Sequence, residues 1–165
     1  MIETERKYLI EYPDTEVLIK QPGCTVGEIT QIYLISNDGE TRRVRKTVIG
    51  ETTVYHSNTK KRISPMSCIE DECIISKAAF DNHVALERDN ALNIIYKTRY
   101  TFDYLGQKFE IDVYPFWYRS AICETELDDE SKSAVFPPFL QVIREVTDDK
   151  RYSNRAMARE LPPEK

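Results

Sequence analysis

The stretch KTRYTFDYLGQKFEIDVY, residues 97–114, carries the pattern that decides the fold. Two runs of aromatic and β-branched residues flank a Leu-Gly pair, and this order predicts two antiparallel strands joined by a tight turn. Because successive side chains of a strand point to opposite faces, Lys97 and Arg99 share one face of the first strand. Glu110 and Asp112 share one face of the second strand in the same way. Each strand therefore has one face that carries a pair of like charges and one mainly apolar or aromatic face.

Pairs of like charge at alternate positions recur along the chain. Besides the two pairs in residues 97–114, they are Glu3 and Glu5, Arg43 and Arg45, Glu70 and Glu72, and Glu124 and Glu126. One interpretation is a half-exposed antiparallel sheet whose charges point to water. The segregation of signs favours another, because clustered carboxylates suit a hard cation and clustered Arg and Lys suit phosphate oxygens. We therefore expect a mainly β fold, a closed barrel with a polar lumen and an apolar outside. Helices such as 76–90 and the C-terminal one would cover that outside.

The composition is typical of one folded domain, which we expect to span residues 1–165. The net charge of −5 argues against sequence-independent binding to nucleic acid. The N-terminus has no long apolar stretch, so we expect neither a signal peptide nor a membrane span. The four cysteines lack CxxC spacing, which indicates free, mostly buried thiols and a cytoplasmic location. The two histidines are too few for a His-rich metal site.

Short strand-like segments dominate the rest of the chain. A helix is expected over 76–90 and a C-terminal helix at about 153–161, while 128–135 could form a short helix and 22–28 a helix or loop. Strands are expected at 5–10, 30–36, 41–49, 52–63, 67–75, 94–104, 108–118, 120–127 and 140–147.

Ordered motifs along nearly the whole chain point to a known family. They are ETERK from Glu3, QIYL, RVR, TKKRIS, IEDE, KTRY, FEIDVYPFW, ETEL and EVTDDKRYSN. The first resembles the ExExK signature of the CYTH superfamily, the triphosphate tunnel metalloenzymes, and the others follow in the order of that family. The resemblance implies an eight-stranded antiparallel barrel forming a tunnel. It also implies hydrolysis of triphosphate compounds or, as in class IV adenylyl cyclases, conversion of ATP to cyclic AMP, with Mg²⁺ or Mn²⁺ as cofactor.

The resemblance also implies roles for individual residues. Lys7 would touch phosphate or orient water, and Glu70 or Glu72 would position the attacking water. Glu145 and Arg151 would lie near a tunnel mouth, with the final helix as a gate or plug. The metal ligands implied are Glu3, Glu5, Glu110, Asp112, Glu124 and Glu126, and the triphosphate-binding residues are Arg43, Arg45, Lys60, Lys97, Arg99 and Arg151.

The chain departs from the family pattern at one position and leaves another open. Cys68 stands where relatives commonly carry an Arg before the middle acidic pair, which could weaken or redirect triphosphate binding. Either Lys60 or Lys61 could be the tunnel lysine, because strand parity puts the two on opposite faces. With so many carboxylates in one lumen, we also expect some raised carboxylate pKa values.

Three classes of function fit the sequence. The first is a metal-dependent triphosphatase, with inorganic tripolyphosphate as the simplest substrate. The second is another enzyme of the same fold, a class IV adenylyl cyclase or a thiamine triphosphatase. The third is a non-catalytic module that binds polyphosphate or nucleotide. In each case the expected partner is a small triphosphate, with no nucleic acid or membrane, and the protein is a monomer or homodimer.

Overall fold

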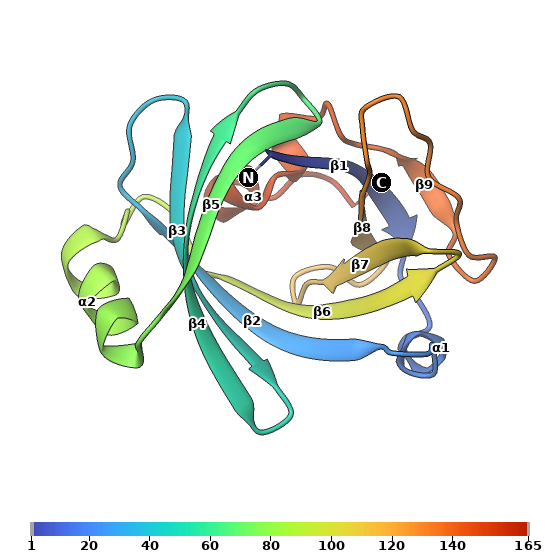
Figure 1. Cartoon of the computed structure of the whole chain (residues 1–165), viewed down its shortest axis with the longest axis horizontal. Helices are drawn as coiled ribbons and strands as arrows, with labels where there is room; N and C mark the ends of the chain where they lie inside the picture. The colour runs from blue at the N-terminus through green and yellow to red at the C-terminus, as the bar shows by residue number, and fades with distance from the viewer. Residues whose placement is uncertain (1, 165) are drawn as a thin grey trace.

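Nine strands and a few short helices make up the computed structural model, which describes residues 2–164 except the side chain of Glu3 (Figure 1). The first half contains β1 (Ile2–Glu11), α1 (Thr15–Ile19), β2 (Thr25–Leu34), β3 (Glu40–Ile49), β4 (Thr52–Arg62), β5 (Ser67–Ile75) and α2 (Lys77–Glu87). The second half contains β6 (Ile95–Tyr104), β7 (Gln107–Val113), β8 (Ser120–Glu126), β9 (Val142–Glu145), the 3₁₀ turn η1 (Lys150–Tyr152) and α3 (Asn154–Arg159).

Eight of the strands close into an antiparallel barrel. Their order is β5-β4-β3-β2-β6-β7-β8-β1, and β1 pairs with β5 through Ile2↔Ile69 to complete the ring. The ninth strand, β9, pairs with a later part of β1, beginning at Tyr8↔Glu145. The prediction of a mainly β fold built on an eight-stranded closed barrel is confirmed.

The stretch 97–114 forms the hairpin β6–β7. Its register pairs Arg99 with Asp112, so the basic face of one strand lies beside the acidic face of the other. The turn places Leu105 and Gly106 at φ values of 51° and 75°. A left-handed conformation at both central residues suits a tight hairpin, and Gly adopts it without a steric penalty.

The outer face of the barrel has two apolar regions, and each of them is covered. On one side, Val44 and Ile32 pack with Phe80 of α2, and Ser76 caps this helix by accepting a hydrogen bond from the Ala79 N–H at 3.0 Å. Elsewhere the outward residues of β6, β7 and β8 are covered by α1 and by the segment 134–140.

The C-terminal segment packs inside the barrel. Tyr152, Met157 and Ala158 form one cluster with Leu9 and Tyr33. Leu9 shares the inward face of β1 with Lys7, and Tyr33 is the cross-strand partner of the inward Arg43. The expectation that this helix covers the exterior was therefore wrong, whereas the plug implied by the family resemblance agrees with the packing. Figure 1 shows α3 within the outline of the ring of strands.

Three local expectations need correction. Residues 128–135 form no helix, because the Asp129 carboxylate accepts the Ser131 N–H at 2.8 Å and stabilises a turn instead. Residues 22–28 run into β2, which starts at Thr25, and the five-residue helix α1 was not anticipated. All four cysteines are free, but only two of them are buried. Within residues 2–164 no helix combines the length and apolarity needed to cross a membrane.

Candidate functional site

Backbone register brings the predicted charged residues of β3, β4 and β5 to the inner face of the barrel. Tyr55, on the opposite face of β4, packs against Phe80 on the outside, which fixes the direction of its neighbours. The inward side chains pair across strands as Arg43 with Asn58, Arg45 with His56, Asn58 with Glu72, and Lys60 with Glu70.

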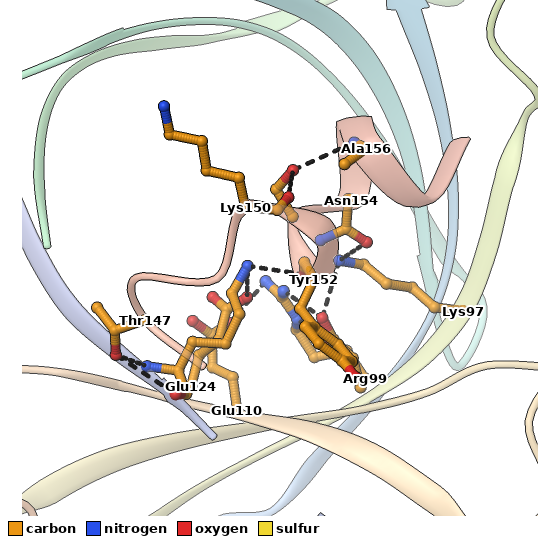
Figure 2. A network of polar contacts seen from close by, with 12 residues as sticks. Lys97, Arg99, Glu110, Glu124, Thr147, Lys150, Tyr152, Asn154 and Ala156 are labelled. Atoms are coloured by element: carbon orange, nitrogen blue, oxygen red, sulfur yellow. Dashed lines mark hydrogen bonds and ion pairs between the residues drawn. The ribbon is translucent and has the colours of Figure 1, made fainter. Parts of the chain in front are cut away.

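A buried ion-pair network occupies the opposite half of the interior, on β6 and β7. The Asp112 carboxylate accepts from Lys97 Nζ at 2.8 Å and from Arg99 Nε at 2.7 Å (Figure 2). A second nitrogen of Arg99 donates to Glu110 at 2.8 Å. The sequence assigned these residues to separate phosphate and metal sites, whereas the hairpin register makes them partners of one another.

The network extends to β8 and β1 through Glu124. Its carboxylate lies 3.5 Å from Lys7 Nζ. Burial raises the pKa of Glu124, but Lys7 and Arg99 overcome this and lower it to about 2. For Asp112, burial likewise opposes ionisation, yet Arg99 and Lys97 hold its pKa well below the ordinary value. The expectation of raised carboxylate pKa values was wrong for these two groups, because cations lie between the carboxylates.

Two lysines of this network also hold the C-terminal segment. Lys7 donates to the Tyr152 carbonyl at 3.3 Å, and Lys97 lies 3.4 Å from the side-chain oxygen of Asn154. Tyr114 donates to the same Asn154 oxygen at 2.8 Å. Figure 2 shows this segment beside the ion pairs, with the side chain of Lys150 extending away from them. The C-terminal segment is thus anchored by polar contacts as well as by apolar packing.

The two inward arginines of β3, Arg43 and Arg45, differ from Arg99 of β6, because no carboxylate of the described residues lies within ion-pair distance of them. Arg45 donates to the side-chain oxygen of Gln31 at 2.8 and 3.1 Å, and Gln31 is a fully buried neutral amide. Burial, together with Arg43 and Arg99, lowers the pKa of Arg45 to about 9. The Nε atom of Arg43 is buried and has no hydrogen-bond partner. Arg43 and Arg45 therefore have no direct carboxylate partner among the described residues.

Three polar residues of this region were missed in the sequence analysis. Asn58 donates to Glu70 and, at 3.1 Å, to Glu72, while its own side-chain oxygen is buried without a partner. His56 lies 3.6 Å from Glu72, and Gln31 supports Arg45. Strand parity could have placed Asn58 and His56 on the inner face, because they precede Lys60 by two and four positions. The sequence prediction used only pairs of charged residues.

The remaining predicted residues lie as follows. Lys60 is on the inner face, 3.7 Å from Glu70, and Lys61 is on the outer face. Glu5 and Glu126 are register partners across β1 and β8. Arg151 is 60% exposed and pairs with Asp149 at 2.7 Å, outside the network.

Glu145 and Cys68 are two further positions that the family resemblance singled out. Glu145 on β9 pairs with Arg6 at 3.1 Å, and Cys68 is buried opposite Arg62 in the β4–β5 register. The side chain of Glu3 lies outside the described part of the structure. Among the side chains that are described, no group of three or more His, Cys, Asp or Glu is arranged to hold a metal ion.

A closed antiparallel barrel with a charged interior is the architecture of the CYTH-like triphosphate tunnel proteins, and the chain matches such structures over nearly its full length. It is 27% identical to the inorganic triphosphatase NE1496, covering 98% of this chain and 97% of that one with a TM-score of 0.58. The PH1819 protein from Pyrococcus horikoshii OT3 shares the fold at 16% identity, with 78% and 80% of the two chains covered and a TM-score of 0.59.

A third structure carries a functional description of its own. A Hippeastrum protein named an adenylyl cyclase, with a dominant triphosphatase activity, matches at 14% identity and a TM-score of 0.50, covering 78% of this chain and 81% of that chain. At this identity the match shows the fold alone. No family model and no curated protein matches the sequence.

Proposed function

We propose that the protein is a metal-dependent triphosphatase that hydrolyses a small triphosphate, in the simplest case inorganic tripolyphosphate, inside the barrel. The observation that carries the proposal is the inward-facing, partly buried pair Arg43 and Arg45, which lacks direct carboxylate partners among the described residues. Burying guanidinium groups without counter-charges is costly, so such a pair is expected where an anion binds. The similarity to the inorganic triphosphatase NE1496 supports the same substrate class.

The residues present suit the demands of phosphoryl transfer. This reaction depends on positioning and on stabilising charge that spreads over phosphate oxygens. Arg43 and Arg45 would bind those oxygens, and Gln31 would hold the Arg45 guanidinium in place. Lys60, on the adjacent strand and facing the same interior, would contribute a further cation. Lys97 and Arg99 have a weaker claim to direct phosphate contact, since Asp112 and Glu110 already accept from them.

The carboxylates of β1 and β8 are the type of ligand that a hard cation such as Mg²⁺ prefers. Glu5 and Glu126 lie opposite each other on neighbouring strands, and Glu3 and Glu124 are at alternate positions on the same strands. Mg²⁺ is commonly held by one or two carboxylates together with substrate phosphates, so a preformed three-carboxylate cluster is not required. When bound, such an ion would neutralise charge on the phosphate oxygens.

Product analysis tests the proposal against its alternatives. The purified protein is incubated with tripolyphosphate, ATP or thiamine triphosphate, each with Mg²⁺, with Mn²⁺ and with EDTA. We expect orthophosphate release from tripolyphosphate that EDTA abolishes and either metal restores. Cyclic AMP and pyrophosphate from ATP would identify a cyclase instead, and binding without turnover of any substrate would identify a non-catalytic module.

A further inference from the structure

The inner face of β3 and β4 holds a group of four polar side chains, most of which have an unsatisfied polar atom. Arg43 and Asn58 are direct cross-strand partners, and so are Arg45 and His56. Three of the four have a buried atom without a hydrogen-bond partner among the described residues, namely Arg43 Nε, Asn58 Oδ1 and His56 Nδ1. Buried polar atoms are normally paired, and orphans that gather at one place indicate a site for a ligand or water.

The orphan atoms are of two chemical kinds. Arg43 Nε is a donor, which suits an anionic oxygen, whereas Asn58 Oδ1 accepts hydrogen bonds. His56 Nδ1 also accepts when the proton of the ring is on Nε2. Phosphate oxygens alone would satisfy only the donors. The acceptors call for a second component that carries protons, and in a hydrolase this component is water.

The surroundings of His56 favour the tautomer that leaves Nδ1 as an acceptor. Its Nε2 atom lies 3.6 Å from Glu72 on β5, and a carboxylate there favours a proton on Nε2. On β3 the facing group is the cation Arg45. On β5 the direct register partner is Ile74, and on β4 the neighbour of the same face is Asn58.

We propose that His56, positioned by Glu72, is the general base that activates the attacking water in the triphosphatase reaction. The inference rests on the proposed function. Water oxygen forms a bond to the terminal phosphorus while one water proton moves to His56 Nδ1. The bridging P–O bond breaks, and its electron pair stays on the oxygen of the departing pyrophosphate, which the arginines stabilise. The imidazolium then releases its proton to solvent.

In this arrangement a carboxylate orients the ring of a general base. The distance of 3.6 Å between His56 Nε2 and the Glu72 carboxylate is longer than a hydrogen bond. Such contacts commonly tighten only when substrate is bound. Glu72 itself is held from the side by Asn58, which donates to it at 3.1 Å. In this arrangement Glu72 is a positioning residue and His56 a catalytic residue.

His56→Asn is the variant that tests the role of the ring. It keeps a polar side-chain atom near the position of Nδ1 but cannot take up a proton. We expect kcat for tripolyphosphate to fall by about 10²-fold or more, with KM changed by less than about threefold, since a general base acts on the chemical step. The pH profiles of kcat for the wild type and the variant should differ in shape, because only the wild type has a proton acceptor at this position.

The second histidine supplies the matched control. His83 lies on α2, outside the barrel, where it contacts Glu87. His83→Asn should leave kcat, KM and the pH profile unchanged. Tripolyphosphate binding measured by calorimetry in EDTA, and the melting temperature, show whether His56→Asn still folds and binds. Added imidazole should restore part of the activity of His56→Ala.

The outcomes separate the inference from the function on which it rests. A wild-type protein without turnover would overturn both. A wild-type protein with turnover, together with a His56→Asn variant that has a normal kcat or the same pH profile as the wild type, would overturn the inference alone. A raised KM with normal kcat would make His56 a substrate contact and not a base, which also overturns it.

Discussion

The two halves of the barrel interior contain similar cations in different surroundings. On β6, Lys97 and Arg99 lie at 2.8 and 2.7 Å from oxygens of Asp112. On β3, Arg43 and Arg45 have no carboxylate within ion-pair distance among the described residues, and Arg45 donates to a neutral amide. The first half satisfies its own charges, and the second leaves positive charge available to an anion.

The difference teaches which charges stabilise the fold and which are reserved for a ligand. The buried Asp112 carboxylate lies between Lys97 and Arg99 and links β7 to β6. Removing this carboxylate would leave the two cations without their counter-charge. A guanidinium without an ion-pair partner instead destabilises the protein when no anion is bound. The lowered pKa of Arg45 has the same cause, because burial disfavours its charged form. The paired half should therefore respond to mutation mainly in stability, and the unpaired half mainly in activity.

The largest effect is expected in the paired half. Asp112→Asn should lower the free energy of unfolding by about 3–5 kcal/mol, because Lys97 and Arg99 stay buried without their counter-charge. Denaturant unfolding followed by circular dichroism measures this. Asp71→Asn, at an exposed position on β5, is the control and should change stability by less than about 0.5 kcal/mol. Equal stability of the two variants would show that the network does not hold the barrel together.

The next effect is expected in activity. Arg45→Met should reduce kcat/KM for tripolyphosphate by about 10²- to 10³-fold, the loss typical of a preorganised charge that stabilises the transition state. Its melting temperature should stay equal or rise, since an uncompensated buried charge is removed. Arg42→Met is the matched control, because Arg42 faces outward and pairs with Glu87 at 3.1 Å. If both variants lost activity equally, the assignment of inner and outer faces on β3 would be wrong.

The smallest effect distinguishes two adjacent lysines. Lys60 faces inward, but Glu70 at 3.7 Å already compensates part of its charge. Lys60→Met should reduce kcat/KM by about tenfold, which corresponds to about 1.4 kcal/mol. Lys61→Met, on the outer face, should leave kinetics unchanged. A larger loss in Lys61→Met would reverse the assignment of faces on β4.

The sequence predicted the barrel because period-two alternation persists through residues 97–114 and the other paired segments. It also placed Arg43, Arg45 and Lys60 on one face, which needs only strand parity. It could not predict that Arg99 would lie opposite Asp112, because cross-strand partners depend on the turn length and register of the hairpin. That register converts two predicted sites into one ion-pair network.

Neutral residues were the other gap in the sequence prediction. The sequence prediction used pairs of like charge at alternate positions, and Gln31, His56 and Asn58 belong to no such pair. Their importance depends on burial and on which of their atoms lack partners, and both follow from three-dimensional packing. The position of the C-terminal helix inside the barrel is likewise a tertiary property that its short apolar pattern did not show.

Calorimetric titration of tripolyphosphate into the wild-type protein and the Arg43→Met/Arg45→Met double variant tests the central claim most directly. EDTA is present throughout, so that binding is measured without turnover. We predict a single site in the wild type and a Kd at least about 10²-fold weaker in the double variant, since two charge-assisted contacts are lost. Equal affinity of the two proteins would contradict the claim that the unpaired arginines of β3 form the anion site.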